Sequence, residues 1–190
     1  MLRRFDHARA DALREPLRTA RAAFGATVMF LLAEEIGDAA EAFAVKFADV
    51  LRRRRVLHGT DPFEALSVSR EAQLRRLRQV LLNQALRMRE RYATVSLREE
   101  QLARALVDAA GPLRSAAATL LELEGAPPPS PKEALERIVS ELGEPAWREA
   151  LGALSRAREE SDLPPGQAAP AFLALLAVAE RLRARAARLG

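Results

Sequence analysis

Apolar side chains recur at helical spacing along most of the chain after residue 68. Between residues 69 and 93 they form one face, and arginines fill the others. The apolar positions are Leu74, Leu77, Leu81, Ala85, Met88 and Tyr92, and the arginines are Arg75, Arg76, Arg78, Arg87, Arg89 and Arg91. Because such a pattern buries one stripe and leaves the rest in water, it predicts a long amphipathic helix from near Ser69 to near Ala93.

Capping residues and prolines place the next boundaries. Ser96 and Glu99 form a capping-box pattern, which predicts that a second long helix starts there. A Gly-Pro pair at residues 111–112 predicts a kink or break within it. The stretch GAPPPSP, residues 125–131, cannot continue a helix and predicts a stiff loop.

Three more helices are expected beyond this loop. The sequence SPKE at residues 130–133 has Ser, Pro and Glu in N-capping positions and predicts a helix to about Leu142. Another opens at Pro145, and the loop DLPPGQ at residues 162–167 precedes the last. The apolar face of this last helix comprises Phe172, Leu175, Leu176, Ala179 and Leu182. Short loops between long amphipathic helices favour antiparallel packing, so we expect a bundle of about five helices after residue 68.

The N-terminal third has a different pattern. The apolar run Ala26–Leu32 is partly β-branched, and large apolar residues alternate with smaller or polar ones over Phe43–Ala48. Both predict short strands, joined by a short helix over residues 34–42. We therefore predict a mostly α protein in two parts: a truncated α/β element with two strands over residues 1–66, and a helical bundle over residues 67–190. A sheet this small needs something to cover its edges.

Composition excludes several classes of protein. The 190 residues are 49% hydrophobic and carry a formal net charge of +4, and 28 of the 30 basic residues are Arg. The charge is modest and mixed in sign, which does not favour a polybasic nucleic-acid-binding tail. Without cysteine the chain has no disulfide or thiolate site. Since it shows no signal-peptide pattern and no apolar run of about 20 residues, we expect a cytoplasmic protein without a membrane segment.

The sequence contains no complete catalytic or metal-binding constellation. The only histidines, His7 and His58, are far apart, and there is no HExxH or D-x-D motif. Neither GxGxxG nor GxxxxGK[ST] occurs, so the usual phosphate-cradling loops are absent. We therefore predict no catalytic residues, no metal and no cofactor.

One cluster of residues is a candidate anion-binding site. Arg52, Arg53, Arg54 and Arg55 are consecutive, and His58 follows shortly after. Guanidinium groups bind phosphate in a planar, bidentate way, which makes this run a candidate phosphate site. Alternatively, the arginines cover the apolar layer with their stems and hold their charges in water, and His58 is a hydrogen-bonded turn residue.

Arg53 and His58 also fit the pattern R-x4-H. This pattern resembles that of HEPN ribonucleases, in which an arginine and a histidine on a helix act on the RNA backbone. The turn sequence at residues 59–62, Gly-Thr-Asp-Pro, places His58 outside a helix and so departs from that family.

A longer stretch resembles bacterial nucleotidyltransferase-like proteins of the polymerase-β superfamily. Residues 28–63 read VMFLLAEEIGDAAEAFAVKFADVLRRRRVLHGTDPF. They are similar to a junction in that family at which a strand, a short helix, a second strand and a turn of the type "RVLYGEDPF" lead into a helical bundle. The turn over residues 56–63 carries most of the match, and the likeness extends over about residues 24–190.

The resemblance implies descent without catalysis. Enzymes of the superfamily hold the triphosphate and two magnesium ions with a Gly-Ser pair and an Asp-x-Asp motif before this junction. Here no Gly is followed by Ser, and none of the seven aspartates belongs to a D-x-D. No catalytic residue of that family can be placed on this chain.

These observations favour a non-catalytic, nucleotidyltransferase-like binding or assembly module. Its expected partner is a second copy of the chain or a separately encoded catalytic nucleotidyltransferase subunit. One alternative is an enzyme, either a diverged nucleotidyltransferase or a HEPN-type ribonuclease using Arg53 and His58. Another is a nucleic-acid-binding module using the arginine-rich face of residues 69–93, which the scarcity of aromatic residues does not favour.

Overall fold

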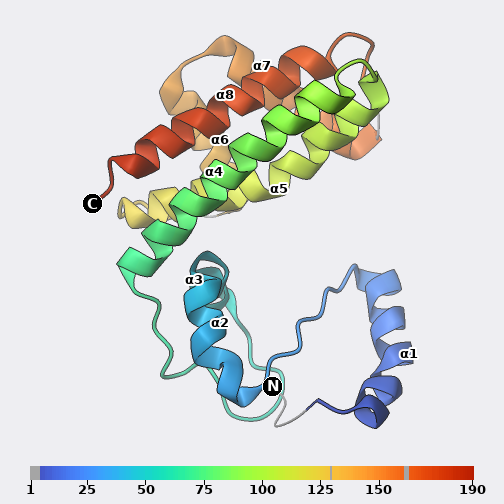
Figure 1. The fold of residues 1–190 in the computed structure, drawn as a ribbon, viewed down its shortest axis with the longest axis vertical. Helices are drawn as coiled ribbons and strands as arrows, with labels where there is room; N and C mark the ends of the chain where they lie inside the picture. The colour runs from blue at the N-terminus through green and yellow to red at the C-terminus, as the bar shows by residue number, and fades with distance from the viewer. Residues whose placement is uncertain (1–4, 129, 161–162) are drawn as a thin grey trace. The chain divides into compact units, whose positions relative to one another are not determined.

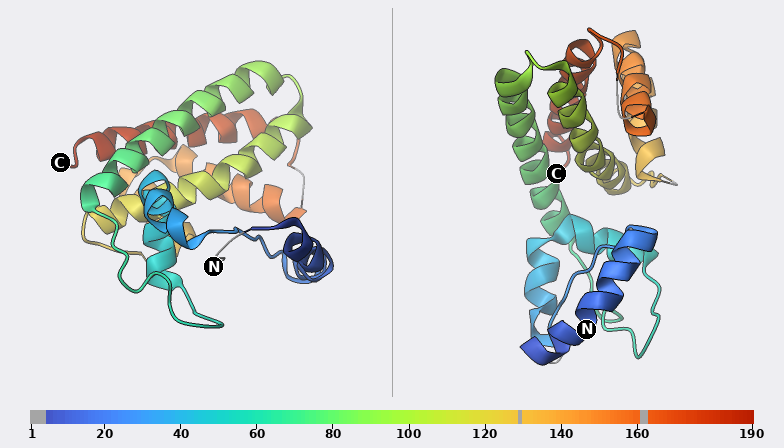
Figure 2. Two further views of the ribbon diagram at one scale, coloured as in Figure 1. Left: turned by 60° about the horizontal axis from the view of Figure 1, so that its bottom comes forward. Right: turned by 90° about the vertical axis from the view of Figure 1, so that its right-hand side faces the viewer.

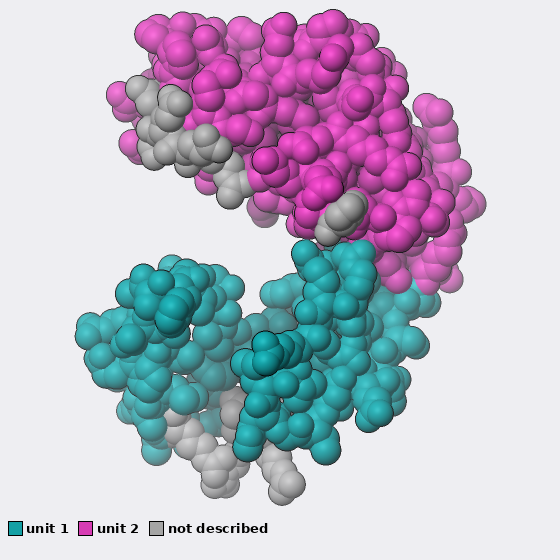
Figure 3. Space-filling model, turned by 180° about the vertical axis from the view of Figure 1, so that it is seen from behind, with its two compact units in different colours: residues 1–69 teal, residues 70–190 magenta. Residues whose placement is uncertain are grey.

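The described structure is built from helices. The computed structural model describes residues 5–128, 130–160 and 163–190. Over these ranges it contains helices and loops but no β-strand (Figures 1 and 2). The chain divides into two compact units, residues 1–69 and 70–190, which are coloured separately in Figure 3. No helix in the described part is long and apolar enough to cross a lipid bilayer.

The described part of residues 70–190 forms five helices, which confirms the predicted helical bundle. They are α4 (Arg70–Val95), α5 (Glu99–Leu123), α6 (Pro131–Leu142), α7 (Pro145–Glu160) and α8 (Ala168–Ala187). Helix α5 packs against each of the other four, and α8 packs against α4, α5 and α7 (Figure 2). The bundle is therefore organised around α5 and α8.

Helix α6 begins with the cap that the sequence predicts. The Ser130 hydroxyl accepts a hydrogen bond from the Glu133 backbone N–H (3.2 Å) and donates one to Glu133 Oε1 (2.8 Å). Pro131 occupies the first turn, where a missing N–H costs nothing. The helix ends at Gly143, whose φ of 77° is the left-handed conformation that glycine adopts without strain.

The capping box expected at Ser96 and Glu99 does not form. Helix α5 starts at Glu99, and its N-cap residue, Arg98, makes no capping bond through its side chain. Glu99 Oε1 instead accepts a hydrogen bond from the backbone N–H of Ala168 at the start of α8 (2.8 Å). The carboxylate accepts from a backbone N–H that has no partner within its own helix, α8, and local sequence spacing cannot reveal such a contact.

The Gly-Pro pair does not end α5. The helix runs unbroken from Glu99 to Leu123, with Pro112 inside it. An interior proline costs about 3 kcal/mol in a helix because it removes one hydrogen bond and clashes with the preceding turn. Ala109, Ala110 and Leu113 are buried on both sides of it, so the packing of α5 outweighs this cost.

Almost all of the buried apolar side chains lie in the helical bundle. Of the 37 buried hydrophobic residues in the described ranges, 34 belong to residues 70–190, and only Ala40, Ala44 and Phe47 belong to residues 1–69. Leucines and alanines fill the interior, and the small alanine side chains let the helices approach closely. The bundle therefore has a core adequate to its size, and the N-terminal unit does not.

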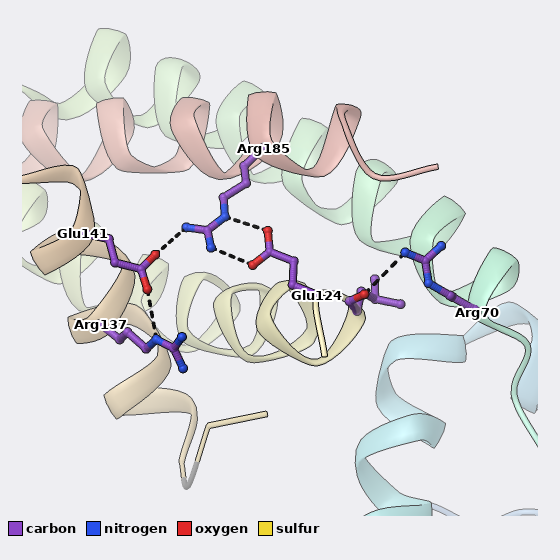
Figure 4. Close-up of polar contacts among 6 residues, drawn as sticks. Arg70, Glu124, Arg137, Glu141 and Arg185 are labelled. Carbon is purple, nitrogen blue, oxygen red and sulfur yellow. Dashed lines mark hydrogen bonds and ion pairs between the residues drawn. The ribbon is translucent and has the colours of Figure 1, made fainter. Parts of the chain in front are cut away.

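A network of charged side chains joins three helices of the bundle (Figure 4). Arg185 of α8 donates from Nε to Glu124 Oε1 (2.7 Å) and from Nη2 to Glu124 Oε2 (2.6 Å), a bidentate pair. Its Nη1 reaches Glu141 Oε2 of α6 (2.8 Å), and Arg137 Nε donates to Glu141 Oε1 (3.0 Å). These bonds, those to Glu124 first, hold the pKa of Arg185 above its ordinary value, so it stays charged.

The same network makes the stability of the bundle depend on pH. Hydrogen bonds from Arg185, opposed by partial burial and assisted by Arg137, lower the pKa of Glu141 below its ordinary 4.5. A carboxyl with a lowered folded pKa stabilises the fold above its unfolded pKa and loses this contribution as pH falls through the folded value. We expect the unfolding free energy, from urea titrations, to fall below pH 4.5 less steeply in Glu141→Gln than in the native chain. Identical pH profiles would contradict this role.

The N-terminal unit contains three α-helices and a short 3-10 turn in its described part. They are α1 (His7–Phe24), η1 (Ala33–Glu35), α2 (Ile36–Ala42) and α3 (Ala44–Arg53). The predicted two-strand element is therefore wrong. The run Ala26–Leu32 lies in an extended loop, and Phe43–Ala48 belongs to the start of α3 and the residue before it. The truncated α/β element expected over residues 1–66 is helical instead.

Helical periodicity prevails over the alternation at Phe43–Ala48. Ala44 and Phe47 are both buried and lie one helical turn apart, and Phe47 packs edge-on against Phe63 at 5.8 Å between ring centroids. Asp49 then pairs with arginines three and four positions later, as helical neighbours do. An alternation of six residues is too short to distinguish a strand from a helix when its small residues are alanines, which are strong helix formers.

Candidate functional site

Two of the four consecutive arginines lie in the last turn of α3 and pair there with Asp49. Arg52 Nη2 lies 2.8 Å from Asp49 Oδ1, and Arg53 pairs with Asp49 Oδ2. Partial burial raises the pKa of Asp49, but hydrogen bonds from Arg53 and Arg52 lower it further, so the net shift is downward and the carboxylate stays charged. Both guanidinium groups therefore already have an anionic partner within the chain.

Arg54 closes the loop after α3. Its Nε and Nη2 lie 2.8 and 2.7 Å from Asp61 Oδ2, and its Nη1 donates to the carbonyl of Leu51. Asp61 Oδ1 accepts the backbone N–H of Phe63 (2.9 Å), which forms a turn around Pro62. The hydrogen bond from Arg54, followed by that from Phe63, lowers the pKa of Asp61. This arrangement fixes the turn at residues 61–63.

Arg55 and His58 are exposed and stand apart from these pairs. Within the described part of the chain, neither side chain has a hydrogen bond or an ion pair. Arg53 is the last residue of α3, and His58 lies in the loop beyond, so the R-x4-H pair does not share a helix as it does in HEPN ribonucleases. Three of the five candidate residues hold internal carboxylates, and phosphate binding by the run stays a prediction.

Several arginines of α4 also have partners inside the bundle. Arg78 donates to the carbonyls of Ala186, Ala187 and Leu189 at the end of α8 (3.2, 3.2 and 2.7 Å). Arg89 Nη2 lies 2.6 Å from Glu180 Oε1 of α8. These side chains satisfy a helix end and join two helices, so the face is not a row of free cations awaiting a phosphate backbone.

Shallow grooves occur on the described surface of the bundle, and two of them are lined by residues of known placement. One, of about 490 Å³, lies between α7 and the start of α8 and is lined mainly by alanine and glycine with Glu149, Arg156 and Gln167. The other, of about 260 Å³, lies between α4 and α5 and is lined by Gln84, Arg87, Arg91 and Asp108 over an apolar floor. No Ser, Thr, Tyr or His lines either groove in the described residues, and no described cluster of His, Asp and Glu could hold a metal ion.

Exposed apolar side chains gather in the N-terminal unit, and sequence reasoning missed them. Eight of the twelve exposed large hydrophobic residues in the described ranges lie there. They are Phe5, Phe24, Val28, Met29, Phe30, Phe43, Val56 and Leu57. The strand predicted over Ala26–Leu32 includes Val28, Met29 and Phe30, which the structure leaves exposed. Apolar residues in a run with no helical periodicity are the signal that could have identified this surface.

The fold places the chain in the class of helical-bundle proteins. Its N-terminal helical unit exposes apolar side chains. The chain was found to match no protein-family model, no curated protein and no solved structure. The resemblance to nucleotidyltransferase-like proteins therefore rests on the residues quoted for it and stays a prediction.

Proposed function

We propose that the chain is a non-catalytic binding or assembly module whose N-terminal unit binds a protein partner. The distribution of apolar residues carries this proposal. Residues 1–69 contain three buried hydrophobic residues and eight large exposed ones in their described part. Burying such side chains against a partner removes apolar area from water, which is the main favourable term in protein association.

The size of the N-terminal core supports the same conclusion. Phe47 is the one large apolar side chain that is buried in the described part of residues 1–69, and Ala40 and Ala44 contribute little area. Phe24 and Leu57 are each 86% exposed. A segment with so small a core gains little from folding alone, because ordering its backbone costs entropy at every residue. A partner that covers the exposed residues supplies the missing apolar contact.

Two partners are proposed. One is a second copy of this chain, and the other, suggested by the sequence resemblance, is a separately encoded catalytic subunit of the nucleotidyltransferase type. An exposed sheet edge no longer motivates this pairing, since the described residues contain no sheet. Exposed apolar side chains replace the edge as the reason for a partner.

A nucleic-acid partner is less well supported. In the helical bundle the Tyr and Trp rings are already engaged, since Tyr92 stacks on Phe172 at 6.1 Å and Trp147 lies under Arg181 at 6.0 Å. Arg78 and Arg89 are bound within the bundle. Both facts reduce what the surface offers to a single strand.

Co-expression with the products of adjacent genes tests the proposal. We expect the full-length chain to form a stoichiometric complex, either with itself or with such a product, detected by size exclusion with light scattering. Replacing Phe24 and Phe30 together by Ser should abolish the complex with such a product, because both side chains are exposed, and Phe30 contacts the ring of Phe5, which is itself exposed. The matched control is Leu97→Ser, which removes an apolar side chain that is 99% exposed in the bundle and should leave the complex intact.

Two results would overturn the proposal. One is a chain that binds neither itself nor a neighbouring gene product. The other is a complex with a neighbouring gene product that persists unchanged when Phe24 and Phe30 are both replaced. Circular dichroism should show the same helix content in all variants, so loss of the complex can be assigned to the surface and not to unfolding.

A further inference from the structure

Helices α4 and α8 share an apolar face that the helical bundle does not cover. Leu82 and Leu86 of α4 are 42% and 50% exposed, and Leu173 of α8 is 43% exposed. In the described part of residues 70–190 only one other large hydrophobic residue is exposed, Leu97 in the loop after α4. Three of the four such side chains of the bundle therefore belong to these two helices.

The exposed leucines lie on corresponding sides of the two helices. Figure 1 shows α4 and α8 side by side, and they run antiparallel, because Arg78 reaches the end of α8 and Tyr92 stacks on Phe172 near its start. On α4, Leu82, Leu86 and Arg89 follow one another at spacings of four and three residues. On α8, Leu173 and Glu180 are seven residues apart. Helical periodicity places each set on one stripe.

An ion pair crosses the seam between the two stripes. Arg89 Nη2 lies 2.6 Å from Glu180 Oε1, and the two side chains are 49% and 43% exposed. The face thus has leucines around a cation and an anion that each still contact water. Such a surface matches a partner that offers leucines and both signs of charge in the opposite order.

We propose that a second copy of this chain covers the α4/α8 face in a two-fold dimer. A two-fold axis brings the same surface against itself, so each leucine meets leucines, and Arg89 of each copy lies near Glu180 of the other. Charge complementarity then arises without any further residue, whereas an unrelated partner would have to supply both charges and the apolar contacts separately. Two helices from each copy form a four-helix interface, a common way to bury such faces.

This inference rests on the proposed function only in taking the chain as an assembly module. It uses a different surface, so the two can fail separately. Replacing Phe24 and Phe30 by Ser should leave the α4/α8 dimer intact. Replacing Leu86 should abolish the dimer and leave any complex formed by the N-terminal unit with a different protein.

Light scattering on the full-length chain gives the first test. We expect a mass of twice 20.9 kDa for the native chain and for Leu97→Glu, and a mass of 20.9 kDa for Leu86→Glu. Leu97→Glu is the matched control because it places the same charge at an exposed leucine away from the face. A native chain that is monomeric, including one in which its own N-terminal unit covers the face, would overturn the inference. So would a dimer that survives Leu86→Glu.

Charge exchange between two variants gives the sharper test. R89E alone and E180R alone each place like charges opposite one another in a homodimer, so each should weaken dimerisation more than about tenfold. When R89E and E180R are mixed, every pair across the interface is attractive again, and native mass spectrometry should detect mainly the mixed dimer. The control mixture of R14E with D11R, an exposed pair of the N-terminal unit, should show no preference for mixed dimers.

Mixing R89E with E180R distinguishes contacts across a dimer interface from a role of Arg89 and Glu180 within one chain. If Arg89 and Glu180 only stabilised the bundle internally, mixing the two variants would restore nothing, because each chain would keep its own like charges. Failure of R89E and E180R to form mixed dimers would therefore overturn the inference, even if Leu86→Glu could not be purified as a folded protein.

Discussion

Phe172→Ala should lower the unfolding free energy of the helical bundle by about 3–5 kcal/mol. Phe172 lies in α8 with no solvent exposure, stacks on Tyr92 of α4 at 6.1 Å, and lies under the groove between α4 and α5. Removing its ring leaves a cavity where α8 meets α4, and helices cannot close such a gap without losing their other contacts. Urea denaturation followed by circular dichroism at 222 nm measures the change.

Phe47→Ala is the matched control, because it removes the same ring at a position with the same lack of exposure. Phe47 lies in α3, within a unit that has only two other buried hydrophobic residues in its described part. We expect the main unfolding transition to shift by less than about 1 kcal/mol, since the transition reports the cooperative bundle. Equal destabilisation by the two substitutions would show that the units fold as one.

Arg185→Ala should lower the unfolding free energy by about 2 kcal/mol, roughly the value of hydrogen bonds to charged groups in a partly buried setting. The substitution leaves Glu124 and Glu141 without their shared partner (Figure 4). Glu124 is only 19% exposed, so its carboxylate cannot recover full hydration. Arg185 also lies in the last turn of α8, where a cation interacts favourably with the helix dipole.

Arg137→Ala is the control for this network. Arg137 makes only an exposed pair with Glu141 on the same helix, and such pairs contribute about 0.3–0.5 kcal/mol. A double-mutant cycle of Arg185→Ala with Glu124→Gln should give a coupling energy above about 1 kcal/mol. Additive effects, or equal losses for Arg185→Ala and Arg137→Ala, would show that the network does not hold the helices together.

The helices of the bundle could be predicted from the sequence because their signals are local. The apolar stripe of α4 and the Ser130 cap of α6 each depend on residues within one or two turns. The partner of Glu99 could not be predicted in this way, since its carboxylate bonds to Ala168 far along the chain. The same holds for Pro112, which α5 tolerates because tertiary packing outweighs local propensity.

The strands failed for a related physical reason. Alternation over Phe43–Ala48 fits a strand only if a sheet exists to bury one face, and short runs do not show whether one does. In the described structure Phe47 is buried as a residue of helix α3. Val28, Met29 and Phe30 lie exposed in a loop. These three side chains belong to the apolar set proposed to bind a partner, and they are exposed because the described residues form no sheet.

The candidate anion site could be predicted only in part from the sequence. Four arginines in a row are conspicuous in any sequence, but whether they are free depends on nearby carboxylates. Asp49 engages Arg52 and Arg53, and Asp61 engages Arg54 across a loop. The first pairing follows helical spacing and required only that α3 be recognised as a helix. The second depends on how the loop folds, which no pattern of charges specifies.

Amide hydrogen exchange on the full-length native chain tests most directly whether the N-terminal unit depends on a partner for its stability. The sample is kept dilute and free of other proteins. We expect the opening free energies of amides in α5 and α8 to lie close to the global unfolding free energy. Amides in α1, α2 and α3 should exchange at rates near those of an unfolded chain. Protection of α1, α2 and α3 equal to that of α5, without a partner, would contradict a unit that depends on one.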